Sequence, residues 1–105
     1  MPQLIELKDC QQDKFPLGRV VITTYSHAKL NPEDVRQALQ RHARGDWGEV
    51  NKHDQRLNEK NLAHHALLWS AYTTSDGTEF FIITASDRST TVIQLPADLE
   101  APTPK

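Results

Sequence analysis

The sequence lacks several features that mark particular protein classes. Its one cysteine, Cys10, cannot form a disulfide within the chain, and a lone thiol is typical of a reducing compartment. The net charge is −2, from 12 basic and 14 acidic residues, so no overall field attracts nucleic acid or an anionic membrane. No window approaches the ~18 apolar residues of a membrane span, and the first residues do not resemble a signal peptide. These absences favour a cytoplasmic protein without a membrane segment.

Metal and cofactor motifs are also missing. The chain has no His-x-x-x-His and no Cys-x-x-Cys pair, whereas structural zinc sites need four clustered ligands. His53 and His64 share a helix face but lie about three turns apart, too far for one ion. His42 falls on an apolar helix face, where we expect a packed core histidine. We therefore predict neither a metal nor a cofactor.

The second half of the chain, from Ala66 to Leu95, has the pattern of consecutive strands. Asp76-Gly77 separates two runs rich in aromatic and β-branched residues, which predicts a hairpin with a two-residue type I′ turn. A polar loop and a third strand, Thr91 to Leu95, follow. The region therefore reads as a three-stranded antiparallel meander.

The first half combines a strand with helices. Residues 17–24 are rich in β-branched side chains and predict a strand. A helix over 32–44 is indicated by Asn31 as its cap, with Pro32 at its first position, and Gly45 follows its end. A second, weaker helix is expected over 51–65. Residues 1–16 read either as a short strand or as an unstructured lead-in, and 25–30 either as one helical turn, which Ser26 would cap, or as a loop.

Together these elements predict an α+β fold with about four antiparallel strands. The order is an N-terminal strand, two helices and the meander. No linker or internal repeat divides the chain, so residues 1–105 are expected to form a single domain. We expect 17–96 to be the ordered core and 97–105 to be a flexible tail.

The predicted register places apolar side chains on both faces of the hairpin. A turn at Asp76-Gly77 pairs residues 73 with 80, 71 with 82 and 69 with 84 on one face, and 72 with 81, 70 with 83 and 68 with 85 on the other. A sheet with one wet face should alternate more cleanly. Either helices cover one face and the N-terminal segment the other, or one face binds a protein partner or a second copy.

Two loops carry candidate binding residues. In the first, Asp87, Arg88 and Ser89 could hold a phosphate through the guanidinium and the hydroxyls. The alternative is an ordinary turn, with Arg88 paired to a carboxylate. The second loop, 41–48, contains a candidate recognition surface; the alternative is that its indole lies in the core. Its candidate residues are Arg41, Arg44 and Trp47.

Two nucleic-acid hypotheses stay open. A metal-independent RNase-like toxin of barnase–RelE layout needs an acid or base and cationic groups near a phosphate. Its residues would be His64, His65, Tyr72, Arg88 and Thr90. Weak nucleic-acid binding would instead use basic side chains of the two helices, and its affinity would depend strongly on salt. Those residues would be Arg41, Arg44 and Arg56.

Two strings resemble one family: RHARGDWG at 41–48 and the meander segment at 67–96, with its Ser-Ala-Tyr, Asp-Gly and Asp-Arg-Ser-x-Thr motifs. The family comprises small, largely uncharacterised proteins of bacterial plasmids and integrative elements. The resemblance implies a bacterial, intracellular, mobile-element setting and brings no catalytic residues. The leading hypothesis is a non-enzymatic interaction or regulatory protein.

Overall fold

The computed structural model describes residues 13–96. The elements are β1 (Arg19–Ile22), α1 (Thr24–Lys29), α2 (Pro32–Ala43), α3 (Lys52–His64), β2 (Leu68–Thr73), β3 (Glu79–Thr84) and β4 (Thr90–Gln94). The predicted α+β class is confirmed, as are the main helices and the three-stranded meander. The expectations for residues 1–12 and for the tail 97–105 lie outside the described residues.

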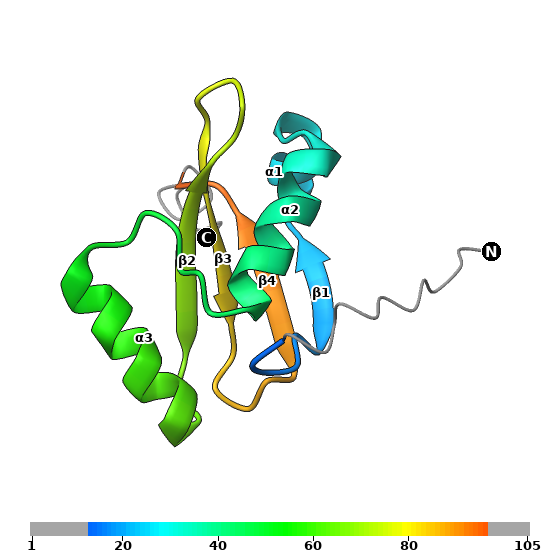
Figure 1. Ribbon diagram of the computed structural model, residues 1–105. Coiled ribbons are helices and arrows are strands. Elements are labelled where there is room, and N and C mark those ends of the chain that lie inside the picture. The colour runs from blue at the N-terminus through cyan, green and yellow to red at the C-terminus, as the bar shows by residue number, and fades with distance from the viewer. Residues whose placement is uncertain (1–12, 97–105) are drawn as a thin grey trace, which may run out of the picture.

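The four strands form one sheet in the order β1-β4-β3-β2 (Figure 1). β2, β3 and β4 are antiparallel neighbours, but β1 runs parallel to β4. The expectation of an all-antiparallel sheet is therefore wrong for this strand. The reason is that the helical connection enters β2 in the direction of β1, and the two hairpin reversals that follow give β4 this same direction.

The caps of the helices follow largely from local sequence. Asn31 caps α2 by accepting from the backbone N–H of Glu33 at 2.7 Å. For the segment after β1 the sequence leaves a helical turn or a loop open, and the structure has the helix, α1. Its cap is Thr23, whose hydroxyl accepts from the N–H of Ser26 at 3.1 Å. The expectation that Ser26 caps this turn is wrong.

The β2–β3 hairpin differs from the prediction by one residue in register. Tyr72 pairs with Phe80, whereas the sequence predicts Thr73 at that position, and every other predicted pair shifts with it. Thr74 donates its N–H to the carbonyl of Thr78, so three residues form the loop. Gly77, at φ 92°, is the left-handed residue of a bulged hairpin, and the type I′ prediction is wrong.

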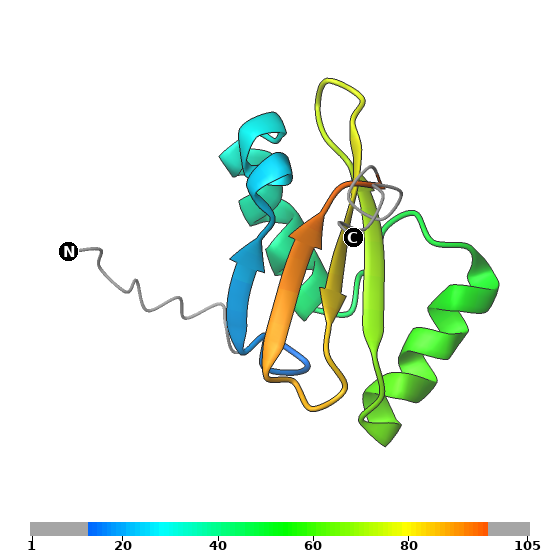
Figure 2. The same ribbon diagram turned by 180° about the vertical axis from the view of Figure 1, so that it is seen from behind.

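Helix α2, together with Leu30 at the end of α1, covers one face of the sheet. Leu30, Val35 and Ala38 pack there against Tyr72, Phe80, Ile82, Ile93 and Leu95. Seen from the other side, the strands are not crossed by any helix of the described chain, and α3 lies beside β2 (Figure 2). Among residues 13–96, no helix has the length and apolar character that crossing a bilayer requires.

Candidate functional site

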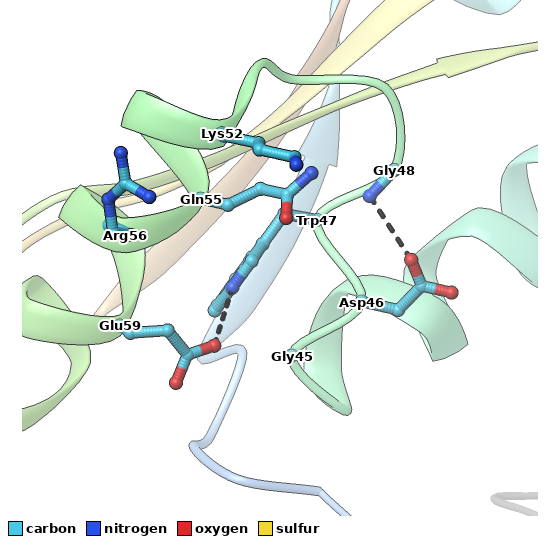
Figure 3. A pocket seen from close by; sticks show the side chains of 8 residues that line it. All are labelled: Gly45, Asp46, Trp47, Gly48, Lys52, Gln55, Arg56 and Glu59. Carbon is cyan, nitrogen blue, oxygen red and sulfur yellow. Dashed lines mark hydrogen bonds between the residues drawn. The ribbon is translucent and has the colours of Figure 1, made fainter.

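A hollow of about 400 Å³ lies beside the connection between α2 and α3 (Figure 3). One wall is the loop Gly45–Gly48, and the other is a single face of α3. The α3 residues recur at helical spacing, which places their side chains in one row. They are Lys52, Gln55, Arg56 and Glu59.

The loop wall is held by a small polar cluster. The carboxylate of Asp46 accepts from the guanidinium of Arg41 at 2.8 and 3.2 Å, and from the N–H of Gly48 at 3.1 Å. The bonds from Arg41 hold the pKa of Asp46 below its usual value. Tyr72 donates its hydroxyl to the backbone carbonyl of Asp46 at 2.6 Å, and Arg41 lies 4.8 Å over the Tyr72 ring. Arg41 is thus committed to holding this loop, while Arg44 is the cap residue that ends α2.

Gly48 is required by the close approach of this loop to β2. It has φ 72°, and a Cβ at this position would lie 2.1 Å from the carbonyl oxygen of Ala71. The short distance exists because Gly48 and Ala71 form a parallel bridge, in which Ala71 accepts from Glu49 and donates to Trp47. The glycine therefore lets the loop extend the sheet beyond β2.

Trp47 is a core residue, as the turn interpretation expects. It is 4% exposed, and its ring stacks on Phe15 and meets His42 edge-on. The indole N–H donates to the carboxylate of Glu59 at 2.8 Å, which ties the loop to α3 (Figure 3). Trp47 therefore connects the core to α3 beside the hollow, and its buried ring is not available for binding a partner.

Exposed charges of both signs remain in the hollow. Lys52 and Arg56 form no ion pair within residues 13–96, and Glu59 faces the same space. In that part of the chain, every buried side-chain nitrogen or oxygen has a hydrogen-bond partner. No buried polar group is therefore left over to prepare the hollow for a particular ligand.

Arg88 fastens the β3–β4 loop to the end of α3. Its guanidinium donates to four backbone carbonyls, those of Ala66, Ala85, Ser86 and Asn61, at 2.7–3.3 Å. The expected carboxylate partner of the turn interpretation is wrong, since the partners are carbonyls. Asp87 accepts from the N–H of Ser89 at 2.9 Å, as turn residues do. The donors that would have held an anion at Arg88 are engaged within the fold.

The structure brings together some, but not all, of the nuclease candidates. Arg88 contacts the backbone on both sides of His64 and His65, and Thr90 begins β4 at this end of the sheet. Tyr72 pairs with Phe80, four residues along β3 from Thr84, which places it about 13 Å away. Burial raises the pKa of its hydroxyl, which already donates to Asp46. Tyr72 therefore does not complete that constellation.

His42 lies in a buried chain of hydrogen bonds that sequence reasoning did not find. The hydroxyl of Thr91 donates to the carbonyl of Leu17 at 2.7 Å, so Thr84 must donate its hydroxyl proton to Thr91. His42 Nε2 then donates to Thr84 at 2.8 Å, and Nδ1 accepts from Ser70 at 2.5 Å. The hydroxyl chain fixes a proton on Nε2, and the lowered pKa of His42 keeps Nδ1 unprotonated, which is the neutral Nε2–H tautomer.

Burial is the main reason why the pKa of His42 falls to about 3, and the nearby charge of Arg88 adds to the effect. His42 is 0% exposed, which confirms it as a core histidine. Within residues 13–96 no group of three or more His, Cys, Asp or Glu side chains is placed to hold a metal ion.

Asn58 closes one edge of the sheet. Its amide donates to the carbonyl of Trp69 at 2.7 Å and accepts from the N–H of Trp69 at 3.2 Å, as a neighbouring strand would. Asn61 donates to the carbonyl of Leu67 at 2.8 Å. By helix propensity alone, asparagine only weakens α3. Its use at the edge of β2 becomes visible only when the helix is placed beside that strand.

The sheet face opposite α2 carries a row of half-buried apolar side chains, here called the open face. Trp69 and Phe81 meet edge-on with ring centres 5.5 Å apart. By register, the charged residues Arg19 and Glu79 lie only at the ends of this face. The row consists of Val21, Trp69, Phe81, Ile83 and Val92.

Comparison with protein-family models, with curated proteins and with solved structures finds no match to the chain.

Proposed function

We propose that this protein is a non-enzymatic interaction module that binds a protein partner through the open face. The observation that carries the proposal is the row of apolar side chains across three neighbouring strands, Phe81 and Ile83 on β3, Val92 on β4 and Val21 on β1. Contiguous apolar surface of this kind typically marks an interaction site. A cytoplasmic, bacterial mobile-element setting belongs to the same proposal and rests on the sequence resemblance.

The interior of the molecule supports a binding role over catalysis. The side chains best suited to catalysis by residue type instead stabilise the fold. His42 belongs to a closed hydrogen-bond chain, Arg88 donates to backbone carbonyls, and Arg41 donates to Asp46. A nucleophile, acid or base must reach a substrate to act. These groups are better suited to stabilising the scaffold that presents the open face.

The test replaces two apolar side chains of the open face by serine, as Ile83→Ser/Val92→Ser. The control is Leu57→Ser, which replaces a leucine of α3 that is 41% exposed. We expect that a partner co-purified with the wild-type chain, or a dimer seen by light scattering, is lost in the first variant and kept in the second. A wild-type monomer whose co-purified proteins are the same in both variants would refute the proposal.

A further inference from the structure

The sheet has two edges, and the described residues treat them differently. The β2 edge is covered by the bridge between Gly48 and Ala71 and by the amide of Asn58. The other edge is β1, which pairs with β4 on one side. Within residues 13–96 no strand pairs with the outer side of β1. An uncovered strand edge is a ready template for another strand.

The backbone groups on the outer side of β1 can be identified. Arg19 donates its N–H to Ser89 at 2.9 Å, and Thr23 donates to Ile93 at 3.2 Å. Odd-numbered residues therefore face β4, and alternation directs the N–H and C=O groups of Val20 and Ile22 outward. The Val20 side chain is also 41% exposed. This edge can therefore accept one more strand without losing any bond to β4.

An apolar groove of about 310 Å³ runs beside this edge. Val20 and Ile22 contribute one side, and Leu30, Val35 and Leu39 contribute the other. Val20 and Ile22 stand in register with the buried Thr91 and Ile93, so their side chains point toward α2. A strand added to β1 would place alternate side chains in this groove.

We propose that residues 4–7 of the same chain, Leu-Ile-Glu-Leu, pair with β1 as an antiparallel strand and insert Ile5 into the groove. This stretch is the most apolar part of the 12 residues that precede the described chain. The backbone of Lys14 is fixed to the carbonyl of Ala43 at 2.7 Å, and β1 begins at Arg19. The free connection is therefore residues 8–13, which can span about 20 Å when extended, and Lys14 is only four residues from Gly18, so the reversal is within reach.

Charge complementarity selects the register. Glu6 is the acidic residue of this stretch, and Arg19, the charged residue of β1, has no ion pair within residues 13–96. Placing Glu6 opposite Arg19 sets Ile5 opposite Val20, whose side chain lies at the groove. The added strand stabilises the edge whether or not the open face binds a partner, so the two proposals fail independently.

Hydrogen exchange of the outward amides, measured by NMR on the full chain, tests the pairing. We expect the Val20 amide, which lies opposite Ile5 in this register, to exchange at least about tenfold faster in Ile5→Asp/Leu7→Asp than in the wild type. The control Gln11→Asp/Gln12→Asp changes the net charge equally and should keep the wild-type rates. Arg19→Glu should also accelerate exchange, and adding Glu6→Arg should restore protection. Equal rates in the wild type and the Ile5/Leu7 variant would overturn the proposal.

The single cysteine allows the strand to be assigned to its own chain. A nitroxide on Cys10 should broaden signals of β1 within the labelled molecule, and should leave them sharp when unlabelled ¹⁵N protein is mixed with labelled ¹⁴N protein. Broadening only in the mixed sample means strand exchange between copies. Protection of Val20 that disappears on dilution means that a second copy covers the edge. Either result would overturn the intramolecular pairing.

Discussion

The covered face of the sheet buries polar side chains beside its apolar core, whereas the open face leaves apolar side chains half-buried. The face under α2 buries polar groups, with Ser70, Thr84 and Thr91 each 0% exposed. The open face leaves large apolar side chains such as Trp69 and Ile83 half-buried. Polar residues are stable on the covered face because each hydroxyl has a partner in the chain through His42.

This difference shows that polarity along a strand does not identify the buried face of this sheet. Hydrophobicity alone selects neither face, because Ser70 and Thr84 share the covered face with Tyr72 and Phe80. The helix decides between them, because α2 brings a ring with one donor and one acceptor to the hydroxyls. The following changes test how the two faces are stabilised.

The largest effect is expected from His42→Ala. The substitution leaves the hydroxyls of Ser70 and Thr84 in a buried cavity without their ring partner. We expect the free energy of unfolding, measured by urea denaturation, to fall by about 3–5 kcal/mol. His53→Ala on the exposed side of α3 serves as the control and should change it by less than about 0.5 kcal/mol. Equal effects of the two substitutions would show that the network is unimportant.

The pH dependence of stability should report the same histidine. The pKa of His42 is lowered from 6.5 to about 3, so between these values the unfolded chain binds a proton that the folded chain does not. This contribution to stability is complete above pH 6.5 and is lost as the pH falls from 6.5 toward 3. The slope attributable to His42 should approach about 1.4 kcal/mol per pH unit. Urea midpoints between pH 7 and pH 4 should fall less steeply in His42→Leu, whereas an unchanged slope would assign the effect to other groups.

A smaller loss is expected at the edge of β2. Asn58→Asp removes the amide donor to the carbonyl of Trp69 and sets a carboxylate against that carbonyl. Thermal and urea unfolding should show a cost of about 1–3 kcal/mol. The more exposed bond of Asn61 to Leu67 provides the comparison, and Asn61→Asp should cost below about 1 kcal/mol. The reverse order would mean that the edge of β2 is held elsewhere.

The smallest effect on stability is expected on the open face. Ile83→Ala should lower the free energy of unfolding by about 1 kcal/mol, because the side chain is only half-buried. Its neighbour Ile82 is 0% exposed on the covered face, and Ile82→Ala should cost about 2–5 kcal/mol. Chemical denaturation of the two variants compares the faces directly. Similar costs would show that the open face is packed within the monomer.

Local signals predicted much of the fold but little of the site. The Asn31 cap and Pro32 locate the start of α2 because a helix terminus is satisfied by its nearest residues. The hairpin was found, but its register depended on whether the loop has two or three residues, and Asp-Gly is compatible with both. The loop around Arg88 contains residue types that are typical of an anion site. The partners of Arg88, however, are the carbonyls of Asn61 and Ala66, at a helix end that is distant in the sequence.

The sequence by itself determined the helices, the strands and the apolar character of both sheet faces, because caps, turns and side-chain periodicity act over a few residues. Only the tertiary structure decided that β1 joins β4 in parallel, that His42 rests on Ser70 and Thr84, and which face stays open. These outcomes depend on contacts between residues 28 to 74 positions apart. A short stretch of sequence does not identify the distant residues that it contacts. Which sheet face is covered and which stays open therefore depends on the position of α2.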